Sequence, residues 1–220
     1  MPPSFGHQIT IEKTPSYAES KLALQRIHRF NSSIKLIVIV RDPVIRLQSS
    51  YAHAMSKFPK PNVTFMKWCG GNKASLIQRM SFVSHVTNIF NIFSRGQIIV
   101  LSEEALEFNP AEMMHQVETF LGLKSAFTKD AFIFNRQKGF YCLNVNNSRY
   151  KVISKHIKTD PRTGCFSKSK GRAHPQVDSA LFKNLVILAQ PYNEKLFRLI
   201  QKRFEWSNLE NFTVKERTEI

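Results

Sequence analysis

The chain has 220 residues and a mass of 25.4 kDa, and its 42% of hydrophobic residues, with 18 phenylalanines, exclude an intrinsically disordered protein. Its 32 Lys and Arg exceed its 16 Asp and Glu, which gives a formal net charge of +16 and a pI of about 10.0. Such a charge attracts polyanions, namely nucleic acids, anionic membranes, phosphate-rich cofactors or sulfated glycans, and composition does not choose among them.

Hydrophobic patterns predict strands that alternate with helices along the chain. β-branched or alternating runs predict strands over residues 8–12, 35–40 and 97–101, and apolar residues at helical spacing predict helices over residues 20–30, 43–58, 75–93, 111–121 and 178–204. Pro191 should kink or split the last helix. Residues 127–139 are expected to be irregular, residues 143–163 to form a polar, basic insert, and residues 210–220 a tail. This order predicts an α/β fold with a mostly parallel sheet.

The first candidate site follows the strand expected over residues 35–40. Ligands of open α/β sheets bind beyond the carboxyl ends of the strands, where Arg41 lies. Ser49 lies two turns into the next helix and can reach a group that Arg41 holds. A guanidinium and a hydroxyl suit a phosphate, whose oxygens match the guanidinium fork. The alternative is that Arg41 and Asp42 only cap the junction between strand and helix.

Two further segments are candidate anion sites. Residues 167–175 place two Lys and one Arg around Gly171, which lets the backbone approach a ligand closely, although an exposed basic loop explains the same pattern. Pro15 stiffens a turn that presents Lys13 after the first predicted strand, and a solvated Lys is the plainer interpretation. Glycine-rich nucleotide-binding fingerprints, metal-ligand spacing of His and a C-x-x-C pair are absent. The aromatic residues are not interleaved with basic ones, so a base-stacking surface is not indicated.

The compartment is ambiguous from the residues alone. No run of about 18 apolar residues and no signal peptide occurs, which taken literally indicates a cytosolic chain. Cys142 and Cys165 flank the polar insert, which suits a loop-closing disulfide, but together with Cys69 they are equally compatible with three free thiols. Four glycosylation sequons mildly favour a secretory route and begin at Asn31, Asn62, Asn146 and Asn211.

Taken together, several ordered motifs closely resemble the heparan sulfate glucosamine 3-O-sulfotransferases. They are residues 11–17 (IEKTPSY), 36–46 (LIVIVRDPVIR), 138–143 (KGFYCL) and 168–175 (KSKGRAHP), with residues 120–123 (FLGL) and 132–135 (FIFN) matching as well. The similarity extends over residues 8–206, which are expected to form one sulfotransferase domain followed by a tail over residues 207–220. It implies a P-loop-like sulfotransferase fold with a central, mostly parallel sheet flanked by helices.

The resemblance implies a sulfuryl transfer from 3′-phosphoadenosine 5′-phosphosulfate (PAPS) to the 3-hydroxyl of glucosamine in heparan sulfate, without a metal and without nucleic acid as a partner. By position, the implied cofactor-binding residues are Arg41, Ser49, Tyr141, Lys170, Gly171, Arg172, Ala173 and His174. The implied substrate-binding residues are Lys13, Thr14, Pro15, Ser16, His53 and Lys57, and Cys142 and Cys165 match the disulfide of the family. The bridged loop is longer here than in the family, over residues 145–158. The full-length protein is expected in the Golgi, with a membrane anchor.

One departure separates this chain from the family pattern. The family's first strand, its Lys- and Gly-rich phosphosulfate loop and the segment with its catalytic Glu all precede the position of Gln8, so no general base is assigned here. We expect either an incomplete copy of a longer Golgi enzyme or a short protein that binds sulfated glycan or nucleotide without catalysis. The 220 residues alone are then expected not to transfer sulfate, and the sheet is expected to have an unpaired edge or a gap.

Overall fold

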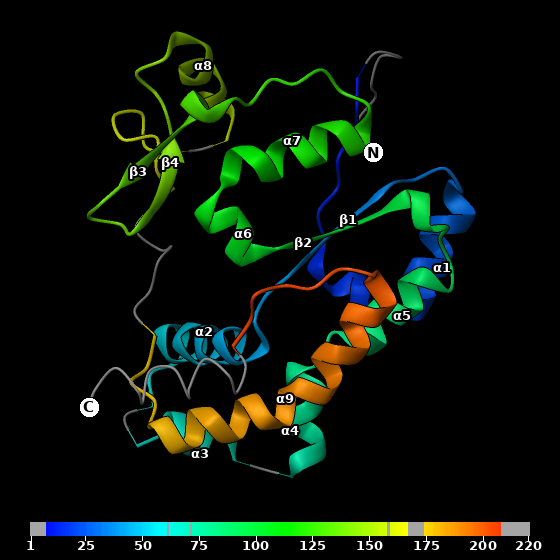
Figure 1. Cartoon of the computed structure of the whole chain (residues 1–220). Helices are drawn as coiled ribbons and strands as arrows, with labels where there is room; N and C mark the ends of the chain where they lie inside the picture. Colours follow the sequence, from blue (N-terminus) through cyan, green and yellow to red (C-terminus); the bar gives the residue numbers. More distant parts are fainter. Residues whose placement is uncertain (1–7, 61, 71, 158, 167–173, 208–220) are drawn as a thin grey trace.

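The computed structural model describes residues 8–60, 62–70, 72–157, 159–166 and 174–207 (Figure 1). Its strands are β1 (Leu36–Val40), β2 (Ile98–Ser102), β3 (Phe132–Asn135) and β4 (Phe140–Leu143). Its α-helices are α1 (Lys21–Phe30), α2 (Pro43–Lys57), α3 (Phe65–Cys69), α4 (Lys73–Met80), α5 (Val83–Phe90), α6 (Glu103–Phe108), α7 (Pro110–Leu121), α8 (Ser148–His156) and α9 (Ser179–Ile200). Three 3-10 turns accompany them: η1 (Pro15–Glu19), η2 (Arg95–Gln97) and η3 (Lys129–Ala131).

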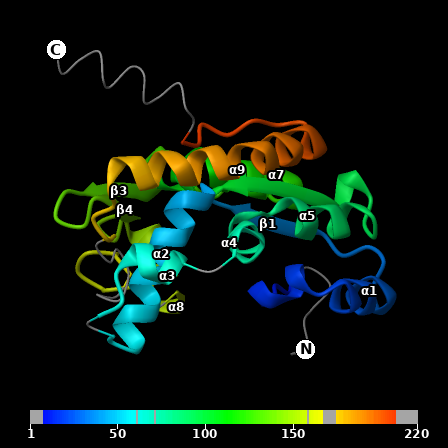
Figure 2. The same cartoon turned by 90° about the horizontal axis from the view of Figure 1, so that it is seen from below.

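The parallel pair β1–β2 lies between helices. Leu36 pairs with Ile98, and the register continues to Val40 opposite Ser102. Figures 1 and 2 place α7 on one side of this pair and α5 with α9 on the other. Val40 and Val100 pack with α5 and α9, whereas Ile37 and Ile39 of β1 point to the other side and stay exposed. The predicted α/β fold with a parallel pair is therefore confirmed, with β3–β4 as a separate antiparallel hairpin.

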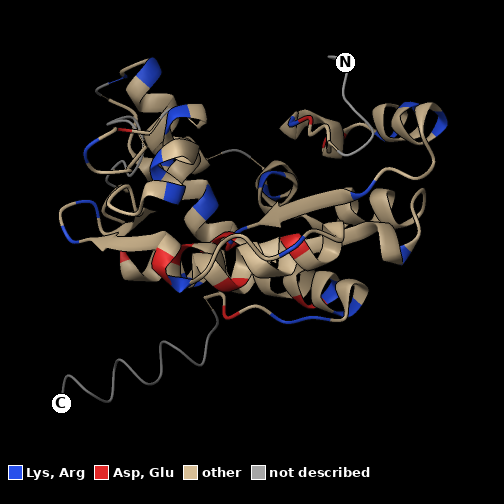
Figure 3. Cartoon of the chain, turned by 90° about the horizontal axis from the view of Figure 1, so that it is seen from above, with Lys and Arg blue, Asp and Glu red and all other residues tan. Residues whose placement is uncertain are grey.

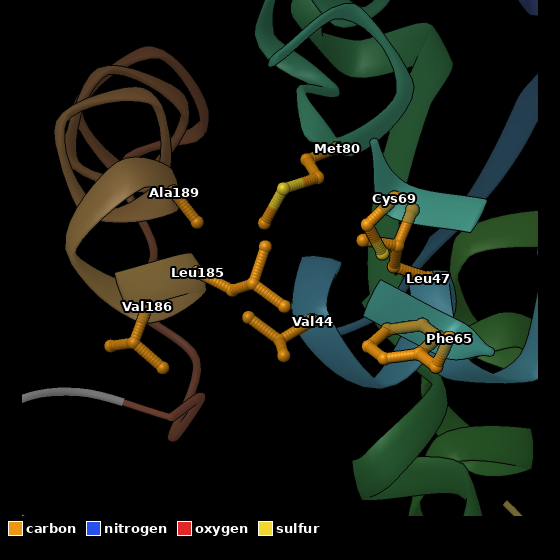
Figure 4. Close-up of a cluster of buried hydrophobic side chains, with 8 residues drawn as sticks. All are labelled: Val44, Leu47, Phe65, Cys69, Met80, Leu185, Val186 and Ala189. Carbon is orange, nitrogen blue, oxygen red and sulfur yellow. The ribbon is translucent and has the colours of Figure 1, made fainter. Parts of the chain in front are cut away.

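A second core anchors α2, the helix that follows β1. Buried side chains of α2, α3, α4 and α9 meet there, and Figure 4 shows Met80 of α4 and Leu185 of α9 approaching Val44 of α2. Burying an aliphatic side chain of this size stabilises the fold by about 2 kcal/mol, so the cluster holds the first turns of α2 firmly against α9. The members of the cluster are Val44, Leu47, Phe65, Cys69, Met80, Leu185, Val186 and Ala189.

Two predicted elements differ in the structure. Residues 8–12 are extended but form no strand, because no described strand lies beside them to pair with. The predicted helix over residues 75–93 is divided into α4 and α5. An unbroken helix would need the carbonyl of Arg79 to accept from the N–H of Val83. The guanidinium of Arg46 takes that carbonyl instead, at 2.6 Å, so the helix ends although its apolar pattern continues.

Patterns within the chain's second half were only partly informative. Residues 127–139, expected to be irregular, contain β3, and the polar insert contains α8. Tyr150 holds α8 in place, since it is 1% exposed and its hydroxyl contacts that of Thr128 at 2.9 Å. Pro191 does not split α9, and both Pro191 and Ile187, whose carbonyl loses its usual N–H donor, lie on the exposed side of the helix. Figure 1 shows α9 bending between its two halves.

The insert is closed at its base by a disulfide between Cys142 and Cys165, as the resemblance implied, and Cys69 is a buried free thiol. Of the two alternatives expected for the sheet, an unpaired edge or a gap, the described residues show the unpaired edge. Strands β1 and β2 pair directly, and within the same residues neither outer edge of the pair has a strand neighbour.

Gly164 brings the end of the insert against β4. Its carbonyl accepts from the N–H of Leu143 at 3.2 Å, its φ is +66°, and an added Cβ would lie 1.8 Å from the carbonyl oxygen of Leu143. The variant Gly164→Ala should therefore lower the free energy of unfolding by about 3 kcal/mol or more. Gly96→Ala, where a Cβ meets nothing within 4 Å, should change it by less than about 0.5 kcal/mol. Urea unfolding measures both, and equal stabilities would contradict the close contact.

Candidate functional site

The site begins where β1 passes into α2. Asp42 caps the helix, since its Oδ1 accepts from the N–H groups of Val44 at 2.8 Å and Ile45 at 3.3 Å, and Pro43 occupies the first helical position. The carboxylate also lies at the positive end of the helix dipole. Arg41 is thereby fixed at the carboxyl end of β1. The capping interpretation holds for Asp42, while the side chain of Arg41 extends into a pocket.

That pocket is open to solvent and has a volume of about 400 Å³. Three residues predicted from the sequence meet in it, namely Arg41, Ser49 and His53. The last two lie four residues apart on one face of α2. The complete lining is Ile39, Arg41, Arg46, Ser49, Ser50, His53, Phe82 and Glu103. The pocket therefore joins the end of β1 to the exposed face of α2.

Two carboxylates of α6 face Arg41. Its Nη1 lies 3.4 Å from an oxygen of Glu103, and its Nη2 lies 3.8 Å from an oxygen of Glu107. The side chain of Arg41 is only 16% exposed, against 40% and 50% for the two glutamates. Its Nε is buried and has no hydrogen-bond partner in the described part of the chain. Arg41 thus keeps donor capacity that the protein itself does not use.

Sequence reasoning did not find Glu103, although the register contains the signal. Val40 lies opposite Ser102, so the residues that follow the two strands, Arg41 and Glu103, emerge side by side at one edge of the sheet. Glu107 then lies one helical turn further along the same face of α6. Burial raises the pKa of the Glu107 carboxyl, Arg41 opposes this effect, and the negative charges of Glu103 and Glu104 add to it.

Arg46 forms the inner wall of the pocket. Its guanidinium stacks 4.7 Å from the centre of the Phe82 ring and donates to the carbonyl of Arg79. Burial lowers the pKa of Arg46, the negative charge of Glu19 raises it, and Arg79 lowers it further. Glu19 is the last residue of η1, the turn that begins within the predicted segment Lys13–Ser16.

His174 is the described end of the second basic segment. Burial lowers its pKa, and the positive charge of Arg41 lowers it further, so the two side chains lie within electrostatic range of each other. The structure therefore brings a residue more than 130 positions away along the chain toward Arg41. Lys170, Gly171, Arg172 and Ala173, which the same prediction includes, lie outside the described residues.

The other predicted residues lie around the pocket and do not line it. Lys57 is exposed one turn beyond His53 on α2. Tyr141 of β4 is 38% exposed and packs edge-on against Phe134, with 5.3 Å between ring centres. Its strand contacts α6, the helix whose carboxylates face Arg41. Lys13 and Thr14 precede η1, and Pro15 and Ser16 are its first residues. This turn contacts α1 and α5.

Glu104 ties the site to the end of the described chain. Its carboxylate accepts from the N–H of Asp42 at 2.7 Å, from the hydroxyl of Ser102 at 2.5 Å and from the indole N–H of Trp206 at 3.0 Å. The second oxygen of Asp42 accepts from the N–H of Ser207 at 2.7 Å. The half-buried carboxylate of Glu104 therefore joins both strand ends to the segment after α9.

Among residues 8–207, leaving out the undescribed positions, no group of three or more His, Cys, Asp and Glu side chains is placed to hold a metal ion. In the same residues, no helix is both long and apolar enough to span a membrane.

Comparison with known proteins defines the class. Residues 11–183 match the sulfotransferase domain, and the chain belongs to that family. It is 35% identical over 212 residues to heparan sulfate glucosamine 3-O-sulfotransferase 6 of Mus musculus, covering 94% of this chain and 59% of the relative. It is also 35% identical to heparan sulfate glucosamine 3-O-sulfotransferase 3B1 of Mus musculus, covering 94% of this chain and 52% of the relative. The resemblance seen in the motifs is thereby confirmed, and the chain spans little more than half the length of these relatives.

A solved structure supports the fold. The sulfotransferase from Alicyclobacillus acidocaldarius superposes with a TM-score of 0.60 at 16% sequence identity, covering 86% of this chain and 63% of the other. At this identity the likeness concerns the fold, which is the sulfotransferase fold expected from the motifs.

The Glu104 network can be tested without a ligand. Glu104→Gln replaces an oxygen acceptor by an amide donor that faces the N–H or O–H groups already present, so we expect a loss of about 2 kcal/mol in the free energy of unfolding. Trp206, 4% exposed, should also shift its fluorescence to longer wavelength as the segment loosens. The exposed neighbour variant Glu205→Gln serves as control and should match the wild type. Unchanged stability and fluorescence in Glu104→Gln would refute the network.

Proposed function

We propose that this protein takes part in the transfer of a sulfuryl group from PAPS to the 3-hydroxyl of glucosamine in heparan sulfate. Membership of the sulfotransferase family gives the reaction class, and the names of the relatives suggest the acceptor. The observation that carries the proposal is the meeting of Arg41, Ser49 and His53 in one pocket at the carboxyl end of β1.

The donor set of this pocket fits the 3′-phosphate of the nucleotide. The guanidinium of Arg41 supplies paired donors, and its buried Nε has no partner among the described residues. Ser49 adds a hydroxyl from the neighbouring turn of α2. His174, whose pKa is held down by burial and by Arg41, would gain a proton more readily once an anion offsets that positive charge. We assign these three residues to the phosphate and extend the assignment to Lys170, Gly171, Arg172 and Ala173 from the motif.

The glycan would lie along the outer side of the pocket. His53 and Lys57 share the exposed face of α2, one turn apart, and continue outward from Ser49. Figure 3 shows the Asp and Glu positions mainly in the middle of the molecule and the Lys and Arg positions along its periphery. A polyanion is therefore attracted to the rim, where the Lys and Arg positions lie. Tyr141 and the segment from Lys13 to Ser16 are proposed contacts for the nucleotide and the sugar, respectively.

PAPS supplies the activated sulfuryl group, and the acceptor hydroxyl must lose a proton during the transfer. Among the described residues, Glu103 is the carboxylate that lines the pocket, and it is already paired with Arg41. This observation favours a second candidate function, a protein of this family that binds heparan sulfate or nucleotide without catalysis. Incubation with labelled PAPS and heparan sulfate separates the two: transferred label supports the enzyme, and binding of both ligands without transfer supports the binding protein.

The disulfide bears on where the protein works. A bridge between Cys142 and Cys165 persists in oxidising compartments and is rare in the cytosol. We therefore propose the lumen of the secretory pathway, and the Golgi in particular, as the site of action of the full-length protein.

Binding of the donor product adenosine 3′,5′-bisphosphate tests the phosphate site directly. Arg41→Ala should weaken binding by about thirtyfold, since a charge-assisted hydrogen bond of roughly 2 kcal/mol is lost. The matched control is Arg26→Ala, an exposed arginine on α1 outside the pocket, which should bind like the wild type. Isothermal titration calorimetry measures both dissociation constants. Equal affinity of Arg41→Ala and the wild type would contradict the assignment.

Heparan sulfate binding tests the outer face of α2. Lys57→Ala should weaken the affinity and reduce the slope of its logarithm against the logarithm of salt concentration, because one cation fewer displaces counterions from the glycan. Lys21→Ala, an exposed lysine at the start of α1, is the control for the same change in net charge and should have a smaller effect. Surface plasmon resonance at several salt concentrations gives both values. Identical effects of the two variants, or tighter binding to duplex DNA than to heparan sulfate, would argue against this face.

A further inference from the structure

The ion pairs of Arg41 set a condition on any ligand of the pocket. One guanidinium faces two carboxylates, from Glu103 and Glu107. If both are ionised, these three side chains together carry a net charge of −1, in a protein whose overall formal charge is +16. Arg46, which lines the same pocket, balances this charge, so an incoming anion meets no net positive charge there and must displace the carboxylates to reach both terminal nitrogens of Arg41.

We propose that Glu103 and Glu107 are specificity-determining residues that compete with the ligand for Arg41, so that the pocket accepts a dianionic phosphate monoester and rejects singly charged sulfate monoesters. The inference rests on the proposed function, because it assumes that Arg41 binds the 3′-phosphate. It adds two residues of α6 that the motifs did not assign.

The charges of the competing anions explain the selection. A phosphate monoester carries about −1.5 to −2 charges at pH 7 and presents three acceptor oxygens, so it can replace both carboxylate contacts of the guanidinium at once. A sulfate monoester carries one negative charge, so its contacts with the guanidinium compensate less well for the two carboxylate contacts that it replaces. Heparan sulfate is itself decorated with sulfate monoesters, and an unopposed Arg41 beside the glycan would attract them. The two glutamates thus keep the acceptor's sulfates out of the phosphate position.

Of the carboxylates of α6, those of Glu103 and Glu107 are the two that can move away from the Arg41 guanidinium. Glu104, the third carboxylate of α6, is bound by Asp42, Ser102 and Trp206 and stays in its network. Glu103 and Glu107 are far more exposed than Arg41, so water can solvate them once they leave the guanidinium. Burial raises the pKa of the Glu107 carboxyl, so its ionised form is less favoured in this position than in water.

The double variant Glu103→Gln/Glu107→Gln tests the competition with two probes, adenosine 3′,5′-bisphosphate and the sulfate monoester 4-nitrophenyl sulfate. We expect both to bind about tenfold more tightly than to the wild type, because the same competitor is removed for each, and the weakly bound sulfate monoester to reach a measurable affinity. Glu112→Gln, an exposed glutamate on α7, controls for the loss of a carboxylate outside the pocket and should retain wild-type affinities. Unchanged or weaker binding of the two probes in the double variant would overturn the inference.

A measurement without any ligand separates this inference from the proposed function. Phenylglyoxal modifies free guanidinium groups, and peptide mapping by mass spectrometry gives the rate at Arg41 alone. The rate should rise several-fold in the double variant and stay at the wild-type value in Glu112→Gln. An unchanged rate would show that the carboxylates do not hold Arg41 and would overturn the inference. If the rate rises but the protein binds neither probe, the carboxylates do hold Arg41, and it is the phosphate site, and with it the proposed function, that is contradicted.

Discussion

The pairing of β1 with β2 is the constraint on which the site depends. Because Val40 lies opposite Ser102, the two chains leave the sheet together, and Arg41 emerges beside Glu103. Because α6 begins directly after β2, Glu104 accepts from the backbone N–H of Asp42 and from the indole N–H of Trp206. One carboxylate therefore holds both the start of α2 and the segment after α9. A slip of the register by one residue would separate Arg41 from both glutamates and would break the contact between the Asp42 N–H and Glu104.

Two opposing distributions of charge follow from this arrangement. The chain as a whole is strongly basic and attracts polyanions over its periphery, as Figure 3 shows. At the carboxyl ends of the strands, α6 pairs two glutamates, Glu103 and Glu107, with Arg41, whose side chain is 16% exposed. The net positive charge therefore attracts any polyanion. In the proposed scheme, anions are distinguished from one another at Arg41, where a ligand must replace the carboxylates. This division suits a protein that must tell a phosphorylated nucleotide from a sulfated sugar chain.

The sequence predicted those parts whose causes are local. The β-branched run before Arg41, the proline that opens α2 and the apolar spacing of α9 each specify one element without help from the rest of the chain. Features that depend on distant partners were missed. The division between α4 and α5 arises from Arg46, and α8 depends on the buried Tyr150. The role of Glu103 depends on strand register, which hydrophobic patterns do not contain.

The central claim is that Arg41 is the phosphate ligand and that the carboxylates of α6 leave it when the nucleotide arrives. A crystal structure of the complex with adenosine 3′,5′-bisphosphate tests this most directly. We expect 3′-phosphate oxygens within hydrogen-bonding distance of the Arg41 guanidinium and the Ser49 hydroxyl, with Glu103 and Glu107 turned toward solvent. A nucleotide bound elsewhere, with Arg41 still paired to both glutamates, would contradict it.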